Sequence, residues 1–290
     1  CFYREGVYDS IEREFRGFGY REQTDSESAT GDDELGFTAP VRVCTWYLTG
    51  QAMDRPRHGY FDGDSEAVDL RPTVFSRYHD GDECDEPVTP DDEDVRYKIA
   101  RALVGAVARI ETWTATDEPA NARLYAVEEF RYLVRDVRPA NLREPASVLL
   151  VRTLEKISYQ YDGFIDDPLC RHEVLLASSE YGHATHTLTI SYARRRLPGD
   201  PPPFSDPDEQ QWWRDAHDMA QRFFYLNETR ARAIDLKDCQ QWRLGLPSQQ
   251  RSNALMLPKG DLPSGLNPQQ MTWDLLKEHV RSPEWNALRV

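Results

Sequence analysis

A series of long segments with the residue pattern of β-strands fills the middle of this chain. Residues 107–116 alternate between polar and apolar side chains, and strand-like segments follow at 124–137, 148–161, 171–178 and 185–194 after short connections. Strands of this length joined by short turns are typical of an antiparallel meander. The sequence therefore predicts a mainly β fold, a long, curved antiparallel sheet with a few short helices.

The segment Glu12–Thr24 is expected to be a strand with a kink. Gly17 and Gly19 are two residues apart, which would place both on one strand face with Phe15 and would turn Phe18 to the other face. Glycine weakens a strand interior unless a bulge, a bend or a close backbone approach requires it. A phosphate loop does not fit, because no glycine-rich turn leads into a helix here.

Further elements flank the central strands. Residues 51–94 carry 14 acidic and 4 basic residues and are expected to form an acidic surface insertion, ordered around a few aromatic and apolar residues. Its acidic end suits a helix N-terminus, so a helix is expected over 91–104, ending at Gly105. The remaining expectations are strands at 40–49, 223–234 and 241–244, a proline-rich loop with a helix over 198–222, and a helix over 267–280.

The overall charge excludes several partners. The formal net charge is −15 and the pI is about 4.9, which argues against a nucleic-acid groove and against docking on anionic lipid. No apolar run approaches the length of a transmembrane helix. The five cysteines include no C-x-x-C pair; most are expected to be buried free thiols, with a disulfide as the alternative. The chain lacks an initiator methionine and is interpreted as a piece of a longer protein.

Several residue pairs suggest chemistry, and each has a simpler structural interpretation. Glu12 and Glu14 would share one strand face, as paired glutamates do in ADP-ribosyltransferases, but only eleven residues precede them, too few for the other strands of that site. His183 and His186 would point to opposite strand faces, which is the wrong spacing for one metal ion. His172–Glu173 and His79–Asp80 are interpreted as surface pairs.

Calcium is a further alternative for the acidic insertion. The segment Asp62–Glu66 has oxygen ligands but lacks the twelve-residue EF-hand loop, so a solvated charged loop is expected. No nucleophile elbow, P-loop, dinucleotide fingerprint or zinc-protease motif occurs. We therefore predict no catalytic residues, no cofactor and no metal site, and a protein that is not an enzyme.

An octapeptide near the N-terminus carries a family resemblance. It consists of Glu12, Arg13, Glu14, Phe15, Arg16, Gly17, Phe18 and Gly19. With Glu22–Asp25 behind it, it resembles the signature of the B subunit of insecticidal toxin complexes, a TcdB-like family related to SpvB and Rhs proteins. Weaker matches follow in the family's order at Trp46–Gly50, Glu155–Tyr161, Glu180–Gly182, Tyr192–Arg195, Asn227–Thr229 and Leu246–Pro247. Leu48 stands where the family commonly has His, and Ala102–Gly105 lacks the family's Lys.

The resemblance implies a structural role. Residues 1–290 would be one middle-to-C-terminal segment of the B subunit, with 51–94 as a variable insertion. Its strands would join those of the Rhs-repeat C subunit in a hollow, secreted β-shell around a toxic effector. The A subunit would be contacted only through a β-propeller outside this segment, which would itself bind no nucleic acid and insert into no membrane.

Two alternatives from other classes stay open. One is an SpvB-like ADP-ribosyltransferase fragment. The other is a carbohydrate- or protein-binding β-domain, with a groove lined by Trp46, Trp113 or Trp212.

Overall fold

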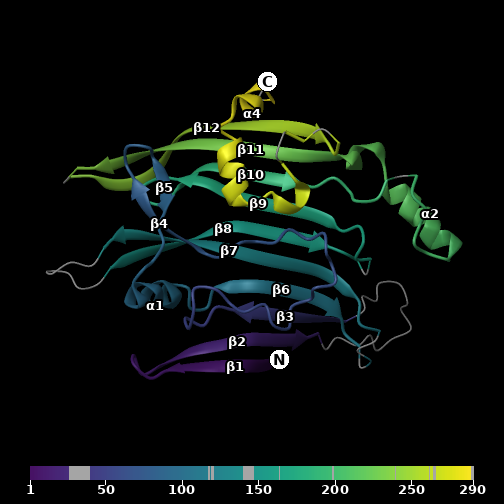
Figure 1. The fold of residues 1–290 in the computed structure, drawn as a ribbon, viewed down its shortest axis with the longest axis horizontal. Helices are drawn as coiled ribbons and strands as arrows, with labels where there is room; N and C mark the ends of the chain where they lie inside the picture. Colours follow the sequence, from purple (N-terminus) through teal and green to yellow (C-terminus); the bar gives the residue numbers. More distant parts are fainter. Residues whose placement is uncertain are drawn as a thin grey trace.

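A computed structural model describes residues 1–288 except 26–39, 117, 119–120, 140–146, 163, 198, 239, 261 and 264–265. Its main feature is a twelve-stranded sheet that stays open at both edges (Figure 1). The first strands are β1 (Phe2–Asp9), β2 (Glu14–Thr24), β3 (Val41–Tyr47), β4 (Val74–His79), β5 (Cys84–Pro87) and β6 (Val107–Thr114). The later ones are β7 (Leu124–Arg138), β8 (Val148–Gln160), β9 (Leu169–Ser178), β10 (Ala184–Ser191), β11 (Phe223–Lys237) and β12 (Trp242–Pro258).

The strand order is nearly the order of the sequence. Ten strands lie side by side as β1-β2-β3-β6-β7-β8-β9-β10-β11-β12, and every neighbouring pair among them is antiparallel. The predicted mainly β fold with an antiparallel meander is therefore confirmed. The sequence underestimated one strand, because β12 continues through Pro258 and pairs with β11 along most of its length.

The acidic segment 51–94 is less superficial than predicted. Its strand β4 pairs in parallel with the second half of β7, beyond the stretch of β7 that pairs with β6, and β5 pairs with β4. Val68, Leu70, Val74 and Phe75 from this segment are buried in the core. Val74 and Phe75 are among the residues around which the segment was expected to be ordered, and together with Val68 and Leu70 they hold it against the sheet.

Among the described residues, six short helical segments lie outside the sheet, and some of them cover parts of it. The helix α1 (Glu93–Ala102) matches the prediction: Asp92 caps its N-terminus, Ile99 and Leu103 are buried, and Gly105 follows with a φ of +80°. Residues 198–222 contain α2 (Pro207–Ala216) and η2 (Met219–Arg222). The single helix predicted over 267–280 is instead η3 (Pro268–Gln270) followed by α3 (Trp273–His279), and α4 (Pro283–Leu288) comes next.

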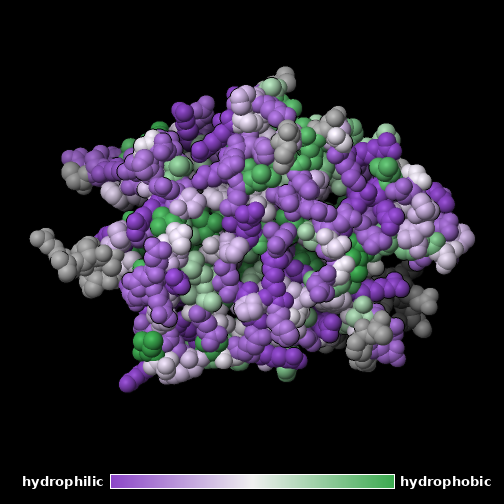
Figure 2. Space-filling view, viewed as in Figure 1, coloured by the Kyte–Doolittle hydropathy of each residue, from purple (hydrophilic) through white to green (hydrophobic). Residues whose placement is uncertain are grey.

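Three apolar clusters form the core. The largest joins β8–β12 to the C-terminal helices through residues such as Leu188, Phe224 and Trp285. A second lies between β7–β8 and the segment around Val68, and a third places α1 against β7 and β8. Hydrophilic residues cover most of the visible surface, with apolar residues showing between them (Figure 2). The α3 and α4 helices lie over the β9–β12 end of the sheet, whereas α2 projects beyond it (Figure 1).

Candidate functional site

The octapeptide Glu12–Gly19 begins in a turn and ends inside β2. Residues 10–13 form the turn between β1 and β2, and Arg13 adopts a φ of +56° there. The Asp9 carboxylate accepts hydrogen bonds from the backbone N–H groups of Ile11 (2.8 Å) and Glu12 (3.1 Å), which fixes the turn. Of the segment Glu12–Thr24 that we expected to be one kinked strand, Glu14–Thr24 forms β2, and only Glu12 and Arg13 belong to the turn.

Arg16 is the buried centre of this segment. Its guanidinium donates to the carbonyl oxygen of Gly50 (2.9 Å), donates to the Tyr97 hydroxyl (2.8 Å) and pairs with Asp9. The Tyr97 hydroxyl also donates to Asp9 (2.6 Å). Arg16 thus links the β1–β2 hairpin to the end of the β3 segment and to α1, which explains why a charged residue is buried at an edge of the sheet.

The same contacts shift the protonation of Asp9. The hydrogen bond from Tyr97 is the main cause that holds the pKa of the Asp9 carboxyl below its ordinary value, and the turn N–H groups and Arg16 act in the same direction. Conversely, the Asp9 carboxylate raises the pKa of Tyr97. The arrangement favours a charged Asp9 and a neutral Tyr97.

Gly17 makes the kink and reverses one predicted face. Its φ is +94°, and β2 places Arg16 and Gly17 opposite Val7 alone, since Gly6 pairs with Phe18 and Tyr8 with Phe15. Two residues against one is a β-bulge. The bulge shifts the alternation, so Phe15 and Phe18 lie on the same face with ring centroids 5.2 Å apart. The prediction that they face opposite ways was therefore wrong.

Gly19 provides space for an ion pair. A Cβ atom at this position would come within 2.7 Å of the Glu5 carboxylate and within 2.8 Å of the Arg55 guanidinium. Arg55 donates to Glu5 at 2.6 Å, and this pair ties the acidic segment 51–94 to the edge strand β1. The two glycines of the octapeptide thus have different reasons: the backbone conformation at Gly17 and the lack of space for a side chain at Gly19.

Glu12 and Glu14 do not form a paired carboxylate site. Glu12 lies in the turn and pairs with Arg101 of α1 (2.7 Å), whereas Glu14 begins β2 and lies 3.7 Å from Arg16. The sequence pattern had indicated that the two carboxylates share one strand face. They do not, because Glu12 lies outside the strand. Their contacts are those of residues that anchor a hairpin.

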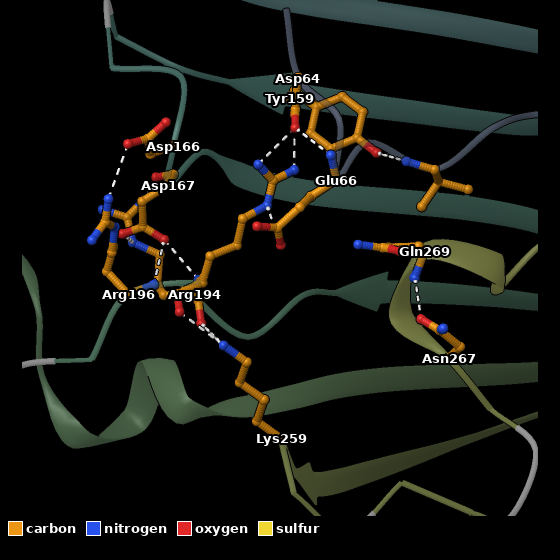
Figure 3. Close-up of polar contacts among 12 residues, drawn as sticks. Asp64, Glu66, Tyr159, Asp166, Asp167, Arg194, Arg196, Lys259, Asn267 and Gln269 are labelled. Carbon is orange, nitrogen blue, oxygen red and sulfur yellow. Dashed lines mark hydrogen bonds and ion pairs between the residues drawn. The ribbon is translucent and has the colours of Figure 1, made fainter.

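A second cluster surrounds the segment Arg194–Arg196 (Figure 3). The side chain of Arg195 donates to both oxygens of Asp64 (2.8 Å each), and Arg196 pairs with Asp166 (2.9 Å). The Asp64 carboxylate also accepts from the Tyr161 hydroxyl (2.7 Å). Asp64 belongs to the proposed calcium segment, but its oxygens are already used by these donors.

Asp167 anchors the long connection between β10 and β11, residues 192–222. Its buried carboxylate accepts from the backbone N–H of Arg195 (2.7 Å) and Arg196 (3.1 Å) and lies 2.6 Å from His217 Nε2. The His217 ring stacks on Trp213 of α2. Sequence reasoning missed both Asp167 and His217. The available signal was the run of arginines at 194–196, shortly after a strand, which requires acidic partners.

Buried ion pairs continue across the middle of the sheet. Arg109 contacts Glu111 and Glu129 (2.8 Å each), Arg131 contacts Glu155 (2.7 Å) and Asp274 of α3 (2.8 Å), and Arg135 holds Asp85 of β5 (2.6 Å). All three arginines are buried. They fasten the covering segments to β6 and β7.

The structure changes the predicted position of His172 and the predicted partner of His79. His172 is fully buried and lies 3.2 Å from Glu155, so its interpretation as a surface pair with Glu173 was wrong. His79 lies 3.2 Å from Asp82 and is exposed. His186 lies 2.6 Å from Glu228, and His183 contacts Ser179 through its backbone N–H.

Other sequence candidates can be placed as well. In the described part of the chain, no group of three or more His, Cys, Asp or Glu could hold a metal ion, and no helix could span a membrane. Cys44 is buried, Cys84 and Cys170 are half-buried, Cys1 is exposed and all four are free; Cys239 lies outside the described residues. Burial raises the pKa of the Cys44 and Cys170 thiols.

The three tryptophans do not line one groove. Trp46 is buried between Tyr20 and Tyr60, Trp113 is half-buried against Phe61, and Trp212 is exposed on α2. Stacking platforms for sugars need exposed rings that converge, which this arrangement does not offer. These three residues therefore do not form the groove that the carbohydrate-binding alternative requires.

The molecule is thus a large, open antiparallel β-sheet protein whose covering segments are fastened by ion pairs. Two family models define it further: the insecticide toxin TcdB middle/C-terminal region matches residues 98–246, and the middle/N-terminal region matches residues 2–50. The chain belongs to the insecticidal toxin TcdB family. No curated protein sequence matches it.

Solved structures of toxin complexes share the fold. The TcdB2–TccC3 complex matches with a TM-score of 0.82 and 30% identity over 97% of this chain and 13% of that chain. The TcdB2–TccC3–Cdc42 complex matches with a TM-score of 0.78 and 30% identity over 92% of this chain and 12% of that chain. The Photorhabdus luminescens Tc holotoxin pore matches with a TM-score of 0.78 and 31% identity, again over 92% of this chain and 12% of that chain. The chain therefore spans only about an eighth of the length of these relatives.

Proposed function

We propose that this chain is a wall segment of a toxin B subunit that builds, with an Rhs-type C subunit, a hollow β-shell around a toxic effector. The observation that carries the proposal is the open sheet itself, which matches TcdB2 in its complex with TccC3 at a TM-score of 0.82. In the described structure β1 pairs only with β2, and β12 only with β11. An edge strand offers backbone groups to a further strand, so the sheet can continue on both sides.

The role is structural rather than enzymatic. The buried ion pairs of Arg16, Arg109, Arg131 and Arg135 connect elements of the fold, and the Glu12 and Glu14 contacts do not support the ADP-ribosyltransferase alternative. The separated tryptophans likewise do not support a carbohydrate-binding domain. As part of a toxin complex, the assembled protein would act outside the cell that makes it, and contact with an A subunit would involve other parts of the B polypeptide.

Co-expression tests this function. The full B polypeptide that contains this segment is produced with an Rhs-type C subunit, purified, and treated with protease. We expect the two chains to co-purify and the C-terminal part of the C subunit to stay protected. Failure of the chains to associate, or digestion of that part at the rate of the free C subunit, would contradict the shell.

A further inference from the structure

Basic residues form a lateral row on the last three strands of the sheet. His186 of β10 pairs in register with Arg230 of β11, and Arg230 pairs with Arg251 of β12. Arg232 follows two residues along β11, on the same face. Like charges directly opposite each other destabilise a sheet, so this row costs stability unless carboxylates compensate it. We call Arg230, Arg232 and Arg251 the arginine patch.

Compensation within the fold is small. Arg230 Nε lies 3.2 Å from Glu228, but the same carboxylate oxygen lies 2.6 Å from His186. Arg251 donates to the neutral amide oxygen of Asn253 (3.2 Å). Among the described residues neither Arg232 nor Arg251 has an ion pair, and all three arginines are exposed. The absence of ion pairs at Arg232 and Arg251 is notable because acidic residues outnumber basic ones in this chain, 50 to 35.

The arginine patch forms one side of a broad groove. The groove has a volume of about 1140 Å³, and four acidic residues, Asp80, Glu83, Glu180 and Asp235, lie among its other lining residues. Of these four, Glu180 already pairs with Lys237 (2.6 Å). Asp235 accepts a hydrogen bond from the backbone N–H of Gly245 (2.7 Å). Pockets for small molecules measure roughly 300–1,000 Å³, so this open groove fits a stretch of polypeptide better than a small ligand.

We propose that the arginine patch binds an acidic, extended segment of the C-type partner subunit. Guanidinium groups bind carboxylates through two parallel hydrogen bonds. Among the described residues β12 pairs only with β11, and a further strand added beside β12 would bring its side chains next to Arg251. The net charge of −15 opposes a long polyanion such as nucleic acid but tolerates a few local carboxylates. The inference rests on the proposed function, because it takes the segment from the partner of the shell.

The test uses the full B polypeptide and a fluorescent probe peptide that alternates Glu and Thr. Binding is followed by fluorescence anisotropy at low and high ionic strength, with a peptide carrying Gln in place of each Glu as the comparison. Arg230→Gln with Arg251→Gln is expected to weaken binding of the acidic peptide about tenfold or more, because both substitutions remove charge-assisted hydrogen bonds to its carboxylates. The control Arg171→Gln, an exposed arginine of β9 paired with Glu173, should bind like the parent.

Three results would overturn the proposal: equal binding of the Gln peptide, unchanged binding by the double variant, or equally tight binding of an oligothymidylate, which would indicate phosphate recognition. If the double variant does not fold, Arg232→Gln alone replaces it and should still weaken binding. The assay contains no C subunit. A B polypeptide that co-purifies with the C subunit yet does not distinguish the peptides therefore refutes the arginine patch without affecting the shell.

Discussion

At the scale of single residues, the octapeptide Glu12–Gly19 combines several separate requirements in one short stretch. Arg16 needs buried acceptors, Gly17 needs a left-handed backbone, and Gly19 leaves room for the Glu5–Arg55 ion pair. These requirements come from different elements of the fold. A substitution at any of these positions therefore acts through its own mechanism, which can be tested separately.

Gly17→Val should destabilise the protein through the backbone. No atom lies within 4 Å of a Cβ built at Gly17, so a steric clash contributes nothing, while a β-branched residue at a φ of +94° is strained by about 1–3 kcal/mol. Chemical denaturation measures the loss. Gly199→Val is the matched control, since its surroundings are equally open and its φ is not left-handed. Equal stability of the two variants would refute the role of the bulge.

The lowered pKa of Asp9 predicts a pH-dependent contribution to folding. A carboxyl whose pKa is lower in the folded state stabilises the fold above its unfolded pKa of 3.8, and this stabilisation is lost as the pH falls through the lower folded pKa. The difference in unfolding free energy between the parent and Asp9→Asn should therefore be constant near neutral pH and should shrink below about pH 4. A difference that does not change down to pH 2 would contradict this assignment.

At the scale of elements, the β4–β5 hairpin depends on one buried ion pair. Arg135 of β7 binds both carboxylate oxygens of Asp85 (2.7 and 2.6 Å) and also donates to the carbonyl oxygens of Ser179 and Glu180. Arg135→Met should reduce stability by about 3–5 kcal/mol, because it leaves a buried carboxylate without its partner. The double variant with Asp85→Leu should regain part of that loss. If it regains none, the ion pair itself is not what holds the hairpin.

The elements also mark where sequence reasoning succeeded and where it failed. The polar–apolar alternation of β6–β10 and the apolar face of α1 could be predicted, because each pattern depends on residues that are close together in the sequence. The part of β12 beyond Leu244 was missed, since Gly245, Pro247 and a polar run hide the pattern of a strand that is defined by its pairing with β11. Asp64 was considered only as part of a calcium loop, and the roles of Asp167 and His217 were missed, because the partners of these residues lie far away in the sequence.

At the scale of the whole molecule, we propose that residues 1–290 act as one folding unit. The largest apolar cluster joins β8–β12 to α3 and α4, and Trp285 of α4 is fully buried within it. Trp285→Ala should lower the stability of the entire unit by about 3–5 kcal/mol while unfolding stays a single transition. Trp212→Ala, at a side chain that is 67% exposed, should have little effect. Two separate transitions in calorimetry would show that the C-terminal helices form their own unit.

The insertion of residues 51–94 has a consequence for how the chain reaches this structure. From β6 onward each strand pairs with the next one in the sequence, so this part can grow hairpin by hairpin. By contrast, β3 pairs with β6 through contacts such as Val41 with Thr114, and β4 pairs with β7. Such contacts between distant residues form slowly, because a long loop must close first. During synthesis, β1, β2 and β3 therefore cannot join the β6–β12 part of the sheet until β6 has emerged.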